Sequence, residues 1–130
     1  MRVCYLFAAS ALLATSCSML NYESDFIDSP QADYSIKSKV NRLDSNRKDY
    51  ALVKLFLFDK NHKQLDSLNT HASDVMAWAV GWANANNLVV YSGDVGTQAW
   101  AVNGGKFQPI AVTQTLQKQA DTFYKKKFKE

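Results

Sequence analysis

The chain of 130 residues is poor in several residue types that define particular protein classes. Its two cysteines are Cys4 and Cys17, so no disulfide can form within the residues that follow Cys17. Five glycines and two prolines are too few for a collagen-like or low-complexity chain. No apolar run reaches the roughly 20 residues that a membrane-spanning helix needs. A domain after Cys17 must therefore be stabilised by its apolar core.

The charge balance is modest and gives no reason to expect a nucleic-acid partner. Lys and Arg number 15, and Asp and Glu number 12. Much of the surplus lies in residues 118–130, which carry five Lys against Asp121 and Glu130. Such a run is usually the solvated face of a last helix, although it would also suit anionic headgroups.

The first residues contain the clearest motif of the chain. Arg2 is the only charged residue before Glu23, and residues 3–14 are apolar except for Ser10. A basic start, an apolar run of about 7–15 residues and a small-residue cleavage site are typical of a secretory signal peptide. The sequence therefore predicts an exported protein.

The end of this run, LATSC at residues 13–17, resembles the lipobox of bacterial lipoproteins. The resemblance implies cleavage between Ser16 and Cys17, with a diacylglyceryl group on the Cys17 sulfur and an acyl chain on its amino group. Two or more chains anchor a protein stably to a membrane. Ser18 then implies, by the same resemblance, an outer-membrane lipoprotein that faces the periplasm.

The lipobox family usually has Leu where this chain has Ala14. Small residues at Ala14 and Ser16 would also suit an ordinary signal peptidase at the same bond, which would leave a secreted protein with a free Cys17. We favour lipidation, because exported proteins use cysteines in pairs and a lone thiol is a liability there.

We expect three parts: a signal peptide at residues 1–16, a lipidated Cys17 with a flexible acidic tether at 17–33, and a single globular domain at 34–130. Residues 18–33 contain four acidic and no basic side chains. As a coil they would reach about 20–25 Å. The alternative is that Phe26 and Ile27 dock on the domain and shorten the tether.

Short alternating segments predict strands in the first half of the domain. Residues 34–43 fit a half-buried strand and also one helix face; we favour the strand, because a turn composition follows at 44–47. Residues 50–58 are apolar on both faces except at Lys54, which predicts a central, doubly covered strand. Residues 63–70 predict a weaker strand nearer an edge.

In residues 75–83 large side chains alternate with small ones. The large ones are Met76, Trp78, Val80 and Trp82. The alternation predicts a strand with one thick face and one thin face. The thin face would let a helix or another strand approach closely.

Three further strands are predicted at residues 88–92, 97–102 and 106–110. The Asn-Gly-Gly sequence at 103–105 is a hairpin signal, because Asn and Gly tolerate positive φ. Pro109 suits only an edge or an end of a strand.

Residues 113–128 predict a helix with a single apolar stripe. The stripe consists of Leu116, Ala120, Phe123, Tyr124 and Phe128. The predicted fold class is α+β: a small antiparallel β-meander of about five or six strands, with this C-terminal amphipathic helix packed on it.

Two sets of residues are candidates for a binding site. Trp78, Trp82 and Trp100 would line an aromatic face for a glycan or a peptide, unless they belong to the core, where the alternation already places the first two. Ser92, Asp94 and Thr97 form a candidate partner-binding loop, in which Asp94 lies between two glycines. The alternative for Asp94 is that it caps its own turn.

The sequence shows no motif for catalysis. His62 and His71 lie in separate polar segments without metal-ligand spacing. No nucleophile elbow frames a serine, and no pair of carboxylates is suggested. We therefore expect no enzymatic activity, no cofactor and no metal site.

Together these features predict a membrane-anchored periplasmic lipoprotein that binds another protein. It would be an immunity or inhibitor lipoprotein, or an accessory subunit of an envelope complex. The alternative is a lipoprotein that binds a glycan or a small molecule through a Trp-lined face. The expected partners are a membrane, through the lipid on Cys17, and a protein, but not nucleic acid.

Overall fold

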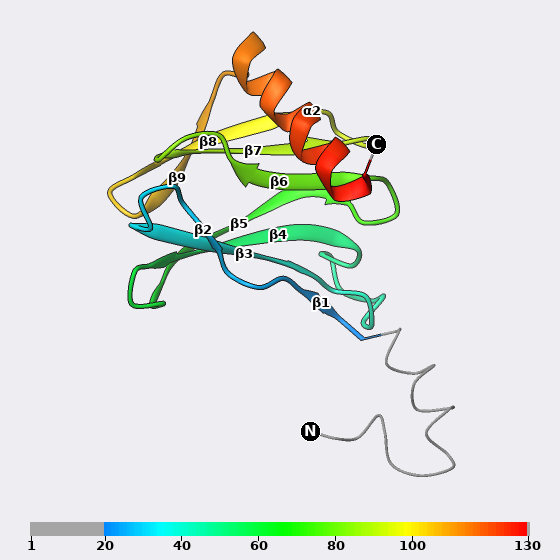
Figure 1. Cartoon of the computed structure of the whole chain (residues 1–130). Coiled ribbons are helices and arrows are strands. Elements are labelled where there is room, and N and C mark those ends of the chain that lie inside the picture. Colours follow the sequence, from blue (N-terminus) through cyan, green and yellow to red (C-terminus); the bar gives the residue numbers. More distant parts are fainter. Residues whose placement is uncertain (1–19, 130) are drawn as a thin grey trace, which may run out of the picture.

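The computed structural model describes residues 20–129 (Figure 1). The predicted signal peptide, the cleavage bond between Ser16 and Cys17, and the lipidated Cys17 lie outside the described residues. The lipoprotein assignment therefore still rests on the sequence motif.

Residues 20–129 form two antiparallel sheets and one C-terminal helix, which confirms the α+β class. The first sheet contains β1 (Tyr22–Glu23), β2 (Ile27–Asp28), β3 (Tyr34–Val40), β4 (Leu52–Asp59) and β5 (Gln64–Ser73). Its order is β1-β3-β4-β5, and β2 also pairs with β3. The second sheet contains β6 (Trp78–Trp82), β7 (Asn87–Ser92), β8 (Gln98–Asn103) and β9 (Lys106–Ile110), in that order. The helix is α2 (Gln114–Phe128).

The prediction of a single meander is wrong, because the chain changes sheets after Ser73. Residues 74–77 carry it to β6, which pairs with β7 and not with β5. The apolar faces of the two sheets then pack against each other, so Val53 and Leu55 share one core cluster with Trp100. Each sheet has one apolar face, and face-to-face packing buries both.

The helix α2 covers the outer face of the second sheet, so the molecule has three layers (Figure 1). Leu116 and Ala120 of α2 form a core cluster with Val89 and Ala99. The predicted thin face of the sixth strand is confirmed, because Phe123 packs closely against Gly81. Thr113 caps the helix by accepting a 3.2 Å hydrogen bond at Oγ1 from the Leu116 amide.

The predicted flexible tether is wrong for residues 20–33. Tyr22 pairs with Val40 and Ile27 pairs with Ile36, so the segment forms part of the first sheet. The alternative considered for Phe26 and Ile27 is confirmed: Ile27 packs against a core cluster, and the Phe26 ring stacks on His62 with centroids 3.7 Å apart. Apolar contacts and strand pairing outweigh the acidic composition, so the folded domain begins before Tyr34.

Other strand predictions are confirmed with small corrections. β4 lies between β3 and β5 as expected, but only its inner face is fully buried; Lys54 and Phe56 on the other face are partly exposed. β6 begins at Trp78 and not at Val75. The predicted hairpin joins β8 to β9 through two glycines with φ of 61° and 75°. β9 is an edge strand, where Pro109 costs no ladder bond.

Candidate functional site

The three tryptophans are core residues, which agrees with the alternative that placed them in the core, so they do not form an open aromatic face. Trp78, Trp82 and Trp100 are only 4%, 9% and 7% exposed. Both indole N–H groups of β6 are engaged: Trp82 Nε1 donates to the Ile27 carbonyl at 2.8 Å, and Trp78 Nε1 donates to Asp74 Oδ1 at 2.9 Å. The tryptophans lie between the two sheets, and face-to-face packing of the sheets buries them.

The loop of residues 92–97 is organised by Ser92 and not by Asp94. The buried Ser92 Oγ accepts hydrogen bonds from the amides of Asp94 and Val95 at 3.0 and 3.1 Å. Asp94 Oδ2 accepts a 3.2 Å bond from the Ser73 amide, which joins this loop to the end of β5. Thr97 is half-buried. Asp94 remains exposed, but its carboxylate is already used within the fold.

Basic side chains gather on the outer face of the first sheet, which α2 does not cover. In the register of β3 and β4, Lys39 lies opposite Lys54 and Lys37 lies opposite Phe56. The Lys39 Nζ lies 4.6 Å from the centroid of the Phe56 ring. Arg47 and Lys48 of the following loop extend this surface beside Lys54. We call it the basic face; its members are Lys37, Lys39, Arg47, Lys48, Lys54 and Phe56.

The lysine pair at the centre of the basic face opposes folding. Like charges placed directly opposite each other in an antiparallel ladder are destabilising. Within residues 20–129, ion pairs with two acidic side chains and the contact of Lys39 with the Phe56 ring offset part of this repulsion. Glu23 lies 2.7 Å from Lys37 and 3.9 Å from Lys39, and Asp49 lies 3.4 Å from Lys54. An uncovered surface with several basic side chains is electrostatically complementary to an acidic partner.

The neighbouring basic side chains lower the pKa of both Glu23 and Asp49. The hydrogen bond from Lys37, followed by the charge of Lys39, lowers the pKa of Glu23. Burial raises the pKa of Asp49, but a hydrogen bond from Asn41 and the charges of Arg47 and Lys54 outweigh it, so the net shift is downward. Both groups therefore stay ionised at neutral pH.

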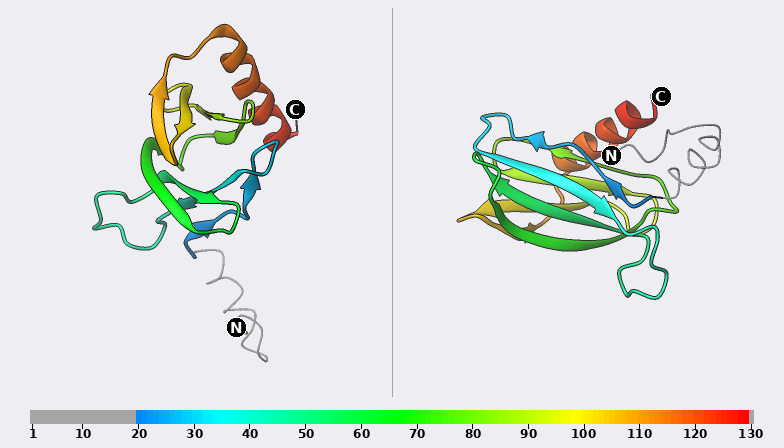
Figure 2. Two further views of the ribbon diagram at one scale, coloured as in Figure 1. Left: turned by 90° about the vertical axis from the view of Figure 1, so that its left-hand side faces the viewer. Right: turned by 90° about the horizontal axis from the view of Figure 1, so that it is seen from below.

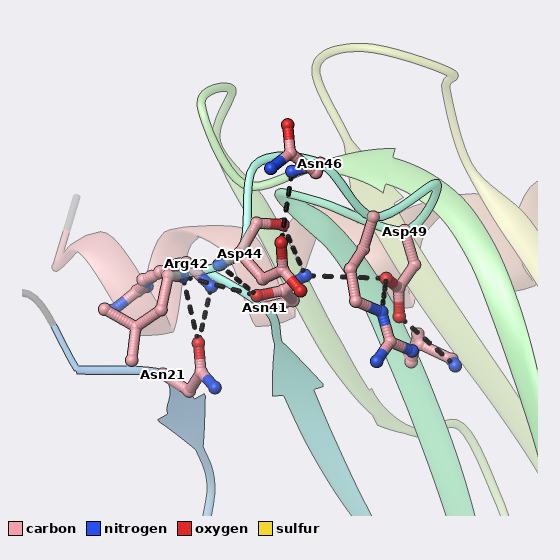
Figure 3. A network of polar contacts seen from close by, with 9 residues as sticks. Asn21, Asn41, Arg42, Asp44, Asn46 and Asp49 are labelled. Carbon is pink, nitrogen blue, oxygen red and sulfur yellow. Dashed lines mark hydrogen bonds and ion pairs between the residues drawn. The ribbon is translucent and has the colours of Figure 1, made fainter.

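The loop between β3 and β4 projects beyond the sheets and is held by its own polar contacts (Figures 2 and 3). Asn41 Oδ1 accepts from the Asp44 amide at 3.0 Å, and Asn41 Nδ2 donates to the Asp44 carbonyl at 3.1 Å. Asn21 Oδ1 accepts from the amides of Arg42 and Leu43 at 2.7 and 3.2 Å. These bonds fix the loop that carries Arg47.

A hollow of about 470 Å³ lies where this loop meets the outer face of the sheet. It is lined by Arg47, Lys48, Asp49, Leu52, Lys54, Asn69 and His71. Arg47, Lys48 and Lys54 are positively charged at neutral pH, and Asp49 is the one acidic side chain among the lining residues. The hollow is thus suited to a carboxylate from a partner protein.

A second concavity lies at the edge of the sandwich between β6 and the segment that contains β1 and β2. This cleft of about 300 Å³ is lined by Tyr22, Ser24, Ile27, Ser38, Trp78, Ala79, Val80, Phe123, Lys126 and Lys127. The Lys127 Nζ donates to the Trp78 carbonyl at 2.6 Å and lies 3.5 Å from the centroid of the indole ring. Burial lowers the pKa of Lys127.

Within residues 20–129, no group of three or more His, Cys, Asp or Glu side chains is arranged to hold a metal ion. His62 stacks on Phe26, and His71 lines the basic hollow. No helix in the described part of the chain has the length and apolar character needed to cross a membrane.

Sequence reasoning missed the basic face. A signal was present, since Lys37 and Lys39 occupy alternate positions of a strand and therefore share a face. The sequence does not show that Lys54 lies opposite Lys39, because that depends on the register between β3 and β4. It also does not show which sheet face the helix covers.

No family model, no curated protein and no solved structure matches this chain.

Proposed function

We propose that this protein is a lipid-anchored bacterial envelope protein that acts by binding the acidic surface of another protein with its basic face. It carries no catalytic activity in this proposal. The signal sequence and Cys17 supply the anchor, and the outer membrane facing the periplasm is the proposed location. An immunity or inhibitor lipoprotein and an accessory subunit of an envelope complex both fit this role.

The observation that carries the proposal is the Lys39–Lys54 pair. These side chains lie opposite each other on an uncovered sheet face, although their repulsion weakens the fold. Phe56 beside them supplies an apolar contact, and the basic hollow beside them accepts a carboxylate. Complementary charge across an interface accelerates association and selects the partner.

A matched pair of variants tests this role. The full chain serves as bait in envelope extracts, and retained proteins are identified by mass. Lys39→Gln with Lys54→Gln neutralises the basic face, whereas Lys60→Gln with Lys118→Gln removes the same charge from exposed positions outside it. We expect one protein bound in stoichiometric amount by the native and control baits and at least about tenfold less by the first variant.

Equal retention by all three baits, or no retained protein at all, would contradict the proposal. The anchor is tested separately by the mass of the mature chain extracted from cells. Three acyl chains on an N-terminal Cys17 are expected. An unmodified Cys17 would leave a secreted protein instead.

The edge cleft supports a second candidate function, the binding of a glycan or another small molecule. Its volume of about 300 Å³ is at the lower end of the range for ligand pockets. Trp78 lines it, so an occupant would alter the tryptophan fluorescence. A shift on addition of cell-wall fragments would support this function, and its absence across such fragments would count against it.

A further inference from the structure

Exposed large apolar side chains are concentrated at one end of the sandwich. Eight such residues are found within residues 20–129, and seven of them belong to this end. The seven are Leu20, Leu43, Tyr50, Val75, Met76, Val95 and Phe128. Val75 and Met76 are 81% and 45% exposed, and the eighth residue, Val112, lies before the start of α2.

Contacts between five segments make this end one continuous surface. The segment at residue 21 bonds to the loop at 42–43, and Arg42 forms a 2.8 Å ion pair with Asp74. Residues 74–77 and the end of α2 line one hollow together. The loop at 93–96 reaches the same place, because the Gly93 amide donates to the Ala77 carbonyl at 2.9 Å.

The charges around this end favour an anionic surface. Lys48, Lys125, Lys126 and Lys129 are exposed, and no ion pair joins them to an acidic side chain of the described chain. Two of the acidic residues nearby are ion-paired, Asp74 with Arg42 and Asp49 with Arg47 and Lys54. Within the described residues, Asp94 and Asp44 accept only backbone amide bonds and keep their charge, so four unpaired lysines face two unpaired carboxylates.

We propose that this end of the domain docks directly on an anionic phospholipid bilayer, with Val75, Met76 and Phe128 entering the headgroup region. Exposed apolar patches rimmed by polar residues mark interaction sites. Apolar side chains beside Lys and Arg are the combination that binds an anionic membrane surface.

The position of Leu20, where the chain enters the domain, supports an orientation with this end toward the membrane. This argument rests on the proposed lipid anchor. Leu20 lies at this end and is three residues from Cys17. An extended chain spans at most about 3.6 Å per residue, so the Leu20 Cα lies within about 11 Å of that of Cys17. The ordered segment from residue 20 thus replaces the long tether expected from the sequence. The strands that carry the basic face begin or end at this end of the sandwich. The basic face is therefore held beside the membrane.

Vesicle sedimentation tests the inference with the mature chain, residues 17–130, bearing Cys17→Ser, so that neither the signal peptide nor an attached lipid contributes. The vesicles contain phosphatidylcholine alone or with phosphatidylglycerol. We expect binding to the anionic vesicles only, weakened by salt. Val75→Ser with Met76→Ser should reduce this binding at least about tenfold. Val112→Ser, an exposed apolar residue outside this surface, is the control and should bind normally.

Equal binding of the double variant, or no binding to anionic vesicles, would overturn the proposal. A third result would also overturn it: the double variant no longer captures a protein from the extract but still binds the vesicles. The surface would then be a protein interface. Thermal unfolding verifies that the variants are folded. The proposed function is tested separately, by the mass of the mature chain and by the Lys39 and Lys54 variants. Failure of the proposed function can therefore be distinguished from failure of this inference.

Discussion

The ring of Phe123 lies against the backbone of Gly81, so a Cβ atom added to Gly81 would lie 2.6 Å from both Cε2 and Cζ of the ring. Real Cβ atoms do not approach other atoms so closely. The contact fixes the distance between α2 and the second sheet. It also places Phe123 at the wall of the edge cleft.

Gly81→Val should lower the free energy of unfolding by about 1–3 kcal/mol, because the ring or the helix must move to accommodate the new side chain. Urea unfolding measures the change. In a Phe123→Ala background the same substitution should cost much less, since the clashing ring is absent. If Gly81→Val lowers the free energy of unfolding equally in the native and Phe123→Ala backgrounds, the clash with the Phe123 ring is not the cause of the loss.

Asp74→Asn should destabilise the protein by about 1–3 kcal/mol at neutral pH, because Arg42 loses its charged partner. Burial raises the pKa of Asp74, but hydrogen bonds from Arg42 and Trp78 outweigh it and leave the pKa below its ordinary value of 3.8. A carboxyl with a lowered folded pKa stabilises the fold fully above its unfolded pKa, and this contribution is lost as the pH falls through the folded pKa.

Unfolding of the native chain and of the Asp74→Asn variant should therefore be compared between neutral pH and pH below 3.8. The difference in stability should shrink in the acidic range. A difference that stays constant with pH would mean that the Asp74 charge does not contribute. Glu23→Gln is a matched control on the exposed basic face, where the effect should be smaller.

Ala51→Gly should stabilise the protein by about 0.5–1 kcal/mol. Ala51 has φ of 60°, a conformation that favours glycine. Its amide donates to the Asn41 carbonyl and its carbonyl accepts from the Asp74 amide, so the backbone is held in place. Ala101→Gly, within β8, should instead destabilise by about 0.5–1 kcal/mol. Calorimetric melting compares the two, and destabilisation by both would refute the argument.

Ser92→Ala should cost about 1–2 kcal/mol, because two backbone amides lose a buried acceptor. Asp94→Ala should cost less than about 0.5 kcal/mol, since its exposed carboxylate accepts a single amide bond. Chemical unfolding of both variants tests this order. The reverse order would restore Asp94 as the organiser of the loop, as the sequence alone had suggested.

Local patterns in the sequence were sufficient to predict most elements of the fold. Alternation predicted the strands, the apolar stripe predicted α2, and the glycines at 104 and 105 predicted the hairpin. The small residues around Gly81 even predicted a close neighbour. These predictions were possible because each depends on a few neighbouring residues. A strand repeats every 2 residues, a helix turns every 3.6 residues, and the preference for positive φ belongs to single residues.

Contacts between distant residues were decided only by the tertiary structure. Residues 20–33 look like a tether because their composition is acidic, yet pairing of Tyr22 with Val40 makes them part of a sheet. The alternation of residues 75–83 already placed Trp78 and Trp82 on a buried face, but no local pattern indicates that the first sheet covers them and Trp100. The sequence by itself determined the signal motif, the strands and the helix, because these depend on neighbouring residues. The opposition of Lys39 and Lys54, and the gathering of apolar side chains at one end, required the three-dimensional packing that brings separate segments together.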